Sequence, residues 1–165
     1  MRIAILGNAG SGKSTLARSL AAKGVAVLDL DTIAWEPNSG AILRPHVSVV
    51  GDLEKFCSGR ADWIVEGCYG DLIETILPWN PELIFLNPGK EACLRNCRNR
   101  AWESHKYPSK AEQDASLETL LAWVSAYYTC SGSMSLAGHR AIFDRYDGPK
   151  REVTRLNQTL SNGNL

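Results

Sequence analysis

The hydrophobic positions of the chain fall into short unbroken runs that alternate with longer stretches of helical periodicity. Apolar runs bounded by Gly, Pro, Asp or Asn predict strands buried on both faces. Five strands are predicted, over 2–6, 25–28, 63–65, 83–86 and 141–143. Six helices are predicted, over 13–23, 49–57, 71–77, 90–105, 116–128 and 150–160. This alternation predicts an α/β fold with a parallel sheet covered on both sides, and ligands at the carboxyl ends of its strands.

The first predicted strand leads directly into a glycine-rich turn. The stretch GNAGSGKST fits the pattern G-x-x-x-x-G-K-[ST]. Its glycines allow backbone conformations that a Cβ would forbid, so that N–H groups gather at the positive end of the following helix dipole. The pattern predicts a phosphate-binding loop made of Gly7, Asn8, Ala9, Gly10, Ser11, Gly12, Lys13, Ser14 and Thr15.

Two side chains of this loop carry the expected chemistry. Lys13 is predicted to reach the β and γ phosphates of a nucleotide, and the Ser14 hydroxyl to occupy one position on Mg²⁺. A flexible glycine turn is the alternative. A GTPase is disfavoured because no N-K-x-D motif or D-x-x-G switch follows the loop, and an ABC-type ATPase because the chain is short and lacks a helical signature segment.

Composition narrows the class of protein. A chain of 165 residues suffices for one domain with a real core. The formal net charge of zero argues against a general nucleic-acid or membrane-surface binder, although a local basic patch stays open. No apolar run approaches the length of a membrane span. Oligomeric state is not indicated by the sequence.

The cysteines point to a reducing compartment. There are five of them, with no C-x-x-C pair or zinc-ligand spacing, and the phosphate loop begins too early for a signal peptide. We therefore expect a reduced, cytoplasmic protein. Cys93 and Cys97 lie four apart in a helical pattern, which favours core packing over a redox or metal role.

Acidic side chains follow the second and third predicted strands. Asp29 and Asp31 come after the second strand, and Glu66 comes after the third. Phosphoryl transfer needs a carboxylate near the Mg²⁺ water shell and a group that positions or deprotonates the attacking hydroxyl. We expect Glu66 in the first role, Asp31 in the second and Asp29 beside the substrate; capping of a helix or turn is the alternative for each.

Cations and one tryptophan complete the candidate site. Arg98 and Arg100 begin a polar, interrupted stretch typical of a lid, over about 98–115, where they would stabilise charge on the transferring group. Arg44 is a candidate partner for an anionic acceptor, and Trp35 for the wall of its pocket. A solvated or purely structural position is the alternative for each of these four residues.

The motifs, in their order, resemble a known family. GNAGSGKST, LDLDTIAW, WIVEGCYG, PELIFLN, CLRNCRNR and REVTRL together resemble the adenylate kinase-related proteins often labelled topology modulation proteins, within the nucleoside-monophosphate-kinase and shikimate-kinase-like superfamily. The resemblance spans nearly the whole chain. It implies one P-loop kinase-like domain over 1–165, a three-layer α/β/α fold with a five-stranded parallel sheet ordered 2-3-1-4-5, and ATP with Mg²⁺ as ligands.

The resemblance also assigns positions and exposes departures. It implies an acceptor-binding segment over about 32–60, a small helical lid that includes Arg98 and Arg100, and residues 147–149 around the adenine base. After the third strand, adenylate kinases continue into an arginine and shikimate kinases into a glycine cluster. This chain has Cys68 and Tyr69 there, which disfavours both AMP and shikimate as acceptors.

Two functions follow from these observations. The first is an ATP-dependent phosphotransferase acting on a small-molecule or nucleotide acceptor. The alternative is a nucleotide-binding regulatory protein, related to DNA topology, with weak or no kinase activity.

Overall fold

The computed structural model describes residues 1–21, 24–36, 42–104 and 107–155. Within these residues, five parallel strands form one sheet ordered β2-β3-β1-β4-β5. The strands are β1 (Arg2–Gly7), β2 (Ala26–Asp29), β3 (Trp63–Gly67), β4 (Glu82–Leu86) and β5 (Lys150–Val153). The predicted fold class and strand order are therefore confirmed.

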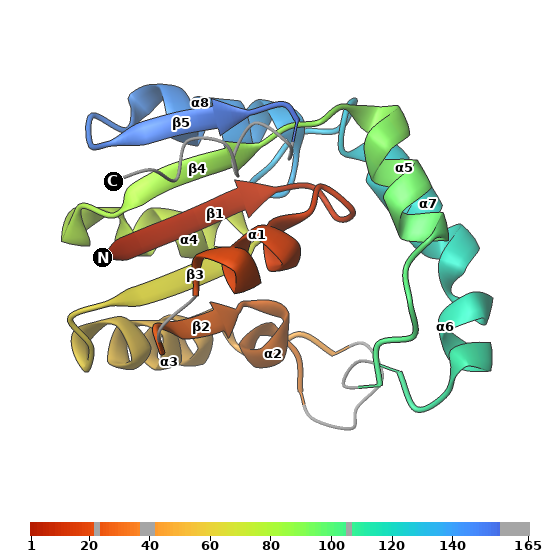
Figure 1. Cartoon of the computed structure of the whole chain (residues 1–165), viewed down its shortest axis with the longest axis horizontal. Coiled ribbons are helices and arrows are strands. Elements are labelled where there is room, and N and C mark those ends of the chain that lie inside the picture. Colours follow the sequence, from red (N-terminus) through yellow and green to blue (C-terminus); the bar gives the residue numbers. More distant parts are fainter. Residues whose placement is uncertain (22–23, 37–41, 105–106, 156–165) are drawn as a thin grey trace.

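Helices cover both faces of this sheet (Figure 1). They are α1 (Lys13–Leu20), α2 (Asp31–Ala34), α3 (His46–Ser58), α4 (Gly70–Ile76), α5 (Lys90–Arg98), α6 (Lys110–Ala115), α7 (Leu117–Ala126) and α8 (Leu136–Arg145), with a 3-10 turn, η1, over Leu77–Trp79. No helix in the described ranges is long and apolar enough to cross a membrane.

The central strand shows why the apolar runs are unbroken. Residues 3–6 of β1 are at most 3% exposed, because neighbouring strands and two helical layers enclose them. Ala4 and Leu6 pack in the core with α3, α4 and α8. Ile3 and Ile5 pack on the opposite face with α1. The same two-sided burial fixes the carboxyl end of β1, from which the glycine-rich loop emerges.

A third apolar cluster lies beyond the carboxyl edge of the sheet. There α5 and α7 pack against each other, with α6 beside them (Figure 1). Cys93 and Cys97 are buried in this cluster as free thiols together with Val124, which confirms their predicted packing role. Ala9 of the glycine-rich loop packs against the same cluster.

The fifth strand lies in a different segment from the predicted one. Residues 141–143, predicted as a strand, belong to α8, whereas β5 occupies the start of the helix predicted over 150–160. In β5 only Val153 is buried, because an edge strand needs few apolar residues. Its charged sequence therefore carried no strand signal.

Helix α8 was missed because a polar residue occupies its buried face. His139 and Ile142, three positions apart, are its buried residues. The Ser135 hydroxyl accepts a hydrogen bond from the Gly138 N–H and caps the helix. With His139 treated as polar, only the short run over 141–143 stood out.

Other element ends also differ from the prediction. The four remaining strands are confirmed with ends at most two residues away. The helices predicted over 49–57, 71–77 and 116–128 are confirmed with ends at most three residues away. Helix α5 ends at Arg98 rather than 105, and α1 ends at Leu20. The short helices α2 and α6, of four and six residues, were not predicted, because they are too short for a periodic signal. Positions 22–23, 105 and 156–160 of the predicted helices lie outside the described residues.

Residues 147–149 lie at the amino edge of the sheet. They precede β5, and the Leu83 N–H at the start of β4 donates to Pro149 O at 2.8 Å. The Tyr146 hydroxyl donates to Pro81 O at 2.6 Å. Because the phosphate loop lies at the carboxyl edge, the expectation that 147–149 surround the adenine base is wrong.

Candidate functional site

The glycine-rich loop joins β1 to α1 in the conformation that its sequence predicts. Gly10 and Gly12 have φ angles of 74° and 98°, a region that L side chains rarely adopt. A Cβ on Gly7 would lie 2.6 Å from Leu86 O, and one on Gly10 would collide with Cys93 O. The loop therefore requires glycine both for its conformation and for its close packing on α5 and β4.

Two asparagines fix the loop to the helices beside it. Asn8 is buried, its Nδ2 donates to Val124 O at 3.0 Å, and its Oδ1 accepts from the Ala9 N–H at 2.8 Å. Asn96 of α5 donates through Nδ2 to Gly10 O at 2.8 Å. Sequence reasoning missed these anchors, because the loop pattern leaves position 8 unspecified and gives no signal at position 96.

The loop has the groups that a polyphosphate needs. Lys13, the first residue of α1, donates from Nζ across the loop to Asn8 O at 3.0 Å. Ser11 is fully buried, and its Oγ has no hydrogen-bond partner among the described residues. A buried hydroxyl without a partner is costly. Together with the left-handed glycines and the N-terminus of α1, these two groups fit a bound phosphate chain.

A cleft of about 270 Å³ opens beside the loop, between α1 and the carboxyl ends of β2 and β3. Its lining includes three residues predicted for the site, Ser14, Asp29 and Glu66. Asp29 and Glu66 are register partners, and Glu66 is buried. Hydroxyl and carboxylate oxygens are the ligand types that Mg²⁺ takes, directly or through water. The residues present therefore fit a Mg²⁺ ion beside the phosphate loop.

Asp31 begins α2 and contacts a tyrosine from the next strand end. The Tyr69 hydroxyl donates to Asp31 Oδ1 at 2.8 Å and accepts from Trp35 Nε1 at 2.9 Å. Burial and the Asp31 carboxylate both raise the pKa of Tyr69, so the phenol stays protonated. Asp29 Oδ1 accepts a hydrogen bond from the Asp31 N–H at 2.9 Å. Asp29 therefore caps the turn into α2, which was the alternative to a role at the substrate, and it also lines the cleft.

Tyr69 is the functional candidate that sequence reasoning missed. It appeared there only as a departure from related motifs. The signal that could have identified it is its place three residues beyond Glu66, where the third strand ends at the predicted ligand edge.

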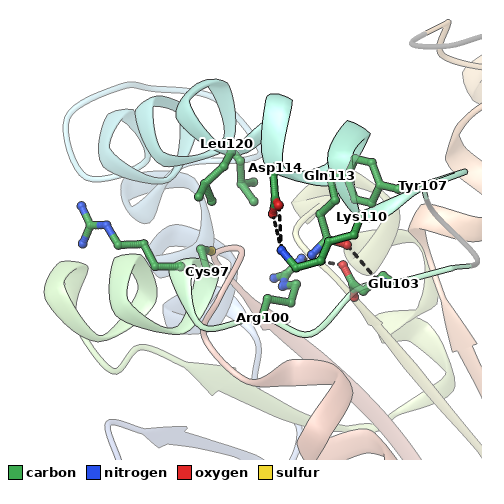
Figure 2. A pocket seen from close by; sticks show the side chains of 10 residues that line it. Cys97, Arg100, Glu103, Tyr107, Lys110, Gln113, Asp114 and Leu120 are labelled. Atoms are coloured by element: carbon green, nitrogen blue, oxygen red, sulfur yellow. Dashed lines mark hydrogen bonds and ion pairs between the residues drawn. The ribbon is translucent and has the colours of Figure 1, made fainter.

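The predicted cations lie outside the cleft. Arg44 donates from Nη1 to Ile33 O at 2.8 Å and from Nη2 to Asp52 Oδ2 at 2.7 Å. Arg98 and Arg100 line a separate pocket of about 40 Å³ between the end of α5 and α6–α7. Arg100 Nη1 donates to Glu103 Oε2 at 3.0 Å. Figure 2 shows these two side chains pointing toward each other beside the helix that carries Lys110. The two arginines thus line one pocket, whereas Ser14 lines the other.

A buried histidine supports the turn after β3. His139 contacts Cys68 O through Nε2 at 2.9 Å and the Tyr127 hydroxyl through Nδ1 at 2.8 Å. Burial lowers the pKa of His139 to about 4, so its ring is neutral near pH 7. Burial likewise raises the pKa of the Cys68 thiol to about 12. His139 is thus structural, and it holds the segment that leads to Tyr69.

Comparison with known proteins identifies the fold. No protein-family model and no curated protein matches the chain. Similar solved structures include a gluconokinase from Sinorhizobium meliloti 1021, with a TM-score of 0.52, 17% identity, and coverage of 92% of this chain and 81% of that one. A sugar kinase from Janibacter sp. HTCC2649 has a TM-score of 0.53, 14% identity and coverage of 96% and 88%. TT1252 from Thermus thermophilus has a TM-score of 0.54, 20% identity and coverage of 96% and 91%.

The chain has the P-loop kinase fold. At these identities the similarity concerns the fold, so the chemistry has to be argued from this chain's own residues. In this fold the loop that leads to Lys13 follows β1. Asp31 follows β2, and its partner Tyr69 follows β3. The loop and the Asp31–Tyr69 pair therefore both lie at the carboxyl edge of the sheet.

Proposed function

We propose that the protein is an ATP-dependent phosphotransferase acting on a small-molecule or nucleotide acceptor. One observation carries the proposal. The phosphate loop with Lys13, the cleft lined by Ser14 and Glu66, and the Asp31 carboxylate all lie at the same edge of the sheet. Donor binding, charge neutralisation and acceptor orientation are the three requirements of phosphoryl transfer.

On the donor side, the loop amides would bind phosphate oxygens, and the Lys13 ammonium would move from Asn8 O to the β and γ phosphates. Ser14 would hold Mg²⁺, with Glu66 in contact with its water shell. When bound there, Mg²⁺ neutralises charge on the phosphates. ATP is proposed rather than GTP because the chain lacks an N-K-x-D guanine motif.

On the acceptor side, Asp31 would orient the attacking hydroxyl and accept its proton. Asp29, the last residue of β2, and Trp35, directly after α2, would contact the acceptor. We assign acceptor binding to the segment over about 32–60, through those of its residues that follow β2 at the carboxyl edge of the sheet. Arg44 supports them through its hydrogen bond to Ile33 O. The Tyr69 hydroxyl holds the Asp31 carboxylate in place, so this carboxylate would not have to reorient during the reaction.

A lid over residues 98–115 completes the proposal. In the structure Arg100 is paired with Glu103, so it would stabilise the transferring phosphoryl group only after this pocket opens toward the phosphate loop. Arg98, at the end of α5, is exposed and lines the same pocket. Substitution of either arginine should therefore lower kcat more than it changes ATP affinity.

Release of ADP from ATP in the presence of Mg²⁺ and a panel of nucleotides, sugars and small hydroxylated acids tests the proposal. One acceptor should stimulate ADP release far above background hydrolysis. Lys13→Ala should then lower kcat/KM by at least about a hundredfold, because it removes a charge that acts on the transferring group. Lys55→Ala is the matched control, since Lys55 is exposed near the carboxyl end of α3. Wild-type turnover by Lys13→Ala would refute the proposal.

A further inference from the structure

The first half of the phosphate loop is a tight turn over residues 8–11. The Ser11 N–H donates to Asn8 O at 3.2 Å and closes the turn. Gly10 is its third residue and has a φ angle of 74°, the left-handed value that this position of a type II turn requires. The backbone of the loop therefore sets the shape of the turn, whereas its placement depends on contacts with other elements.

Two carbonyl groups of this turn are bonded to side-chain donors. Asn8 O accepts from Lys13 Nζ at 3.0 Å, at the start of α1. Gly10 O accepts from Asn96 Nδ2 at 2.8 Å. Of these two donors, Lys13 belongs to the phosphate loop itself, whereas Asn96 is a half-buried residue of α5. The hydrogen bond from Asn96 therefore fixes the turn to a different element of the fold.

The N–H groups of the loop are arranged differently from these carbonyls. Among the described residues, no backbone carbonyl accepts a hydrogen bond from the N–H groups of Gly10, Gly12, Lys13 or Ser14. N–H groups of this kind, at the N-terminus of a helix, bind phosphate oxygens. A carbonyl oxygen that turned toward the same space would repel them. A donor that holds a loop carbonyl elsewhere therefore favours phosphate binding.

Asn96 lies on the face of α5 against which the turn packs. A Cβ on Gly10 would collide with Cys93 O and would lie 2.7 Å from Cys97 Sγ. Positions 93, 96 and 97 are three and four residues apart, so they share one helix face. Packing limits how closely the turn approaches α5, whereas a hydrogen bond is directional and sets where the Gly10 carbonyl points. Asn96 supplies that hydrogen bond.

We propose that Asn96 is a positioning residue of the phosphate site. This inference rests on the proposed function. The Asn96 side chain holds the Gly10 carbonyl toward α5, so that this oxygen does not turn toward the phosphates and the loop is ordered before ATP binds. Without the donor, the Gly10 carbonyl loses its partner, and the backbone at this glycine can rotate more freely than at any other residue type.

Three variants of the full chain test this role. Asn96→Leu has a similar volume and lacks the donor, and Asn96→Asp replaces the amide by a carboxylate of the same shape. Asn99→Leu is the matched control, because Asn99 is exposed directly after α5. Calorimetric titrations use Mg²⁺ with ATP and Mg²⁺ with tripolyphosphate, which has the phosphate chain without the nucleoside. Both Asn96 variants should bind both ligands at least about fivefold more weakly than the wild type, and Asn99→Leu should bind them as the wild type does.

The pH dependence of binding separates positioning from packing. The carboxyl group in Asn96→Asp can donate to Gly10 O only when it is protonated, and the approach of a phosphate favours its protonated form. The ATP affinity of this variant, divided by that of the wild type, should therefore rise at least about twofold from pH 7.5 to pH 5. The same ratio for Asn96→Leu should stay constant. Dividing by the wild type removes the titration of ATP itself.

The outcomes distinguish this inference from the proposed function. ATP affinity equal to that of the wild type in Asn96→Leu would overturn the inference and leave the phosphotransferase proposal standing. Weak binding by Asn96→Asp at an unchanged ratio from pH 7.5 to pH 5 would also overturn it, because the loss would then come from packing. Circular dichroism checks the fold of each variant, and Asn96→Asp alone decides the test if Asn96→Leu does not fold. No ATP binding by the wild type would remove the proposed function as well.

Discussion

Asp29 and Glu66 lie opposite each other in the register of β2 and β3, and both line the cleft that Ser14 borders from α1. Parallel pairing places the ends of the two strands side by side. Two carboxylates more than thirty residues apart in the chain therefore lie next to the hydroxyl of the phosphate loop. This arrangement concentrates negative charge where a divalent cation would serve the reaction.

Glu66→Gln tests this carboxylate pair. We expect the Mg²⁺ concentration needed for half-maximal turnover to rise about 10- to 100-fold, because the amide cannot bind the metal's water shell as a carboxylate does. A magnesium titration of initial rates measures the effect. Glu82→Gln is the control, since Glu82 starts β4 at the amino edge of the sheet and pairs there with Arg151. An unchanged Mg²⁺ requirement in Glu66→Gln would exclude the metal role.

Tyr69→Phe tests the hydrogen bond to Asp31. The ring is kept, but the hydroxyl that orients the carboxylate is lost. We expect kcat with the acceptor to fall about tenfold, while the KM for ATP stays within a factor of two, as a positioning role requires. Tyr146→Phe removes a comparable hydroxyl at the amino edge and should leave both constants unchanged. Equal kinetics for Tyr69→Phe and the wild type would refute the positioning role.

Gly10→Ala tests the packing of the phosphate loop. The left-handed φ angle and the collision with Cys93 O should together lower the free energy of unfolding by about 3 kcal/mol or more. Gly24→Ala should cost only about 1 kcal/mol, because Gly24 has a similar φ angle but open space around it. Urea denaturation of both variants measures the difference. Equal losses would show that crowding at Gly10 adds nothing.

The sequence predicted the phosphate loop and the sheet because both depend on local patterns. Glycine spacing sets the loop, and unbroken apolar runs mark strands with two covered faces. The Asp31–Tyr69 contact depends instead on the register of β2 with β3 and on the one-turn helix α2. A hydroxyl–carboxylate pair 38 positions apart leaves no local trace.

The errors have the same physical origin. His139 lies on the buried face of α8 because Cys68 O and the Tyr127 hydroxyl satisfy its ring, and such tertiary partners are not visible in a hydropathy pattern. Residues 150–153 form a strand because the exposed edge of β4 offers hydrogen bonds. The pairing of Arg100 with Glu103, three positions later, was likewise not visible in the sequence pattern, and the role proposed for Arg100 at the phosphates requires this pair to open.

The neutral state of His139 predicts a dependence of stability on pH. Its folded pKa, about 4, lies below the ordinary 6.5. The unfolded chain therefore binds the proton more readily, and the contribution is complete above pH 6.5 and lost as pH falls toward 4. Between pH 7 and 5 this residue alone should cost about 2 kcal/mol.

Urea unfolding of the wild type and His139→Asn at the two pH values isolates this contribution. The variant should lose correspondingly less stability between pH 7 and 5. His46→Asn, which alters an exposed histidine paired with Asp71, should retain the wild-type dependence. Equal pH dependence in the wild type and His139→Asn would contradict the assignment.

The central claim is that the loop between β1 and α1 binds the phosphates of ATP. Calorimetric titration of the full chain with ATP in the presence of Mg²⁺ tests it most directly, with Lys13→Ala and Lys55→Ala measured alongside. We expect one ATP site in the wild type and in Lys55→Ala, and at least tenfold weaker binding in Lys13→Ala, because a charge-assisted contact to phosphate is lost. No binding heat in the wild type, or equal affinity in Lys13→Ala, would contradict the claim.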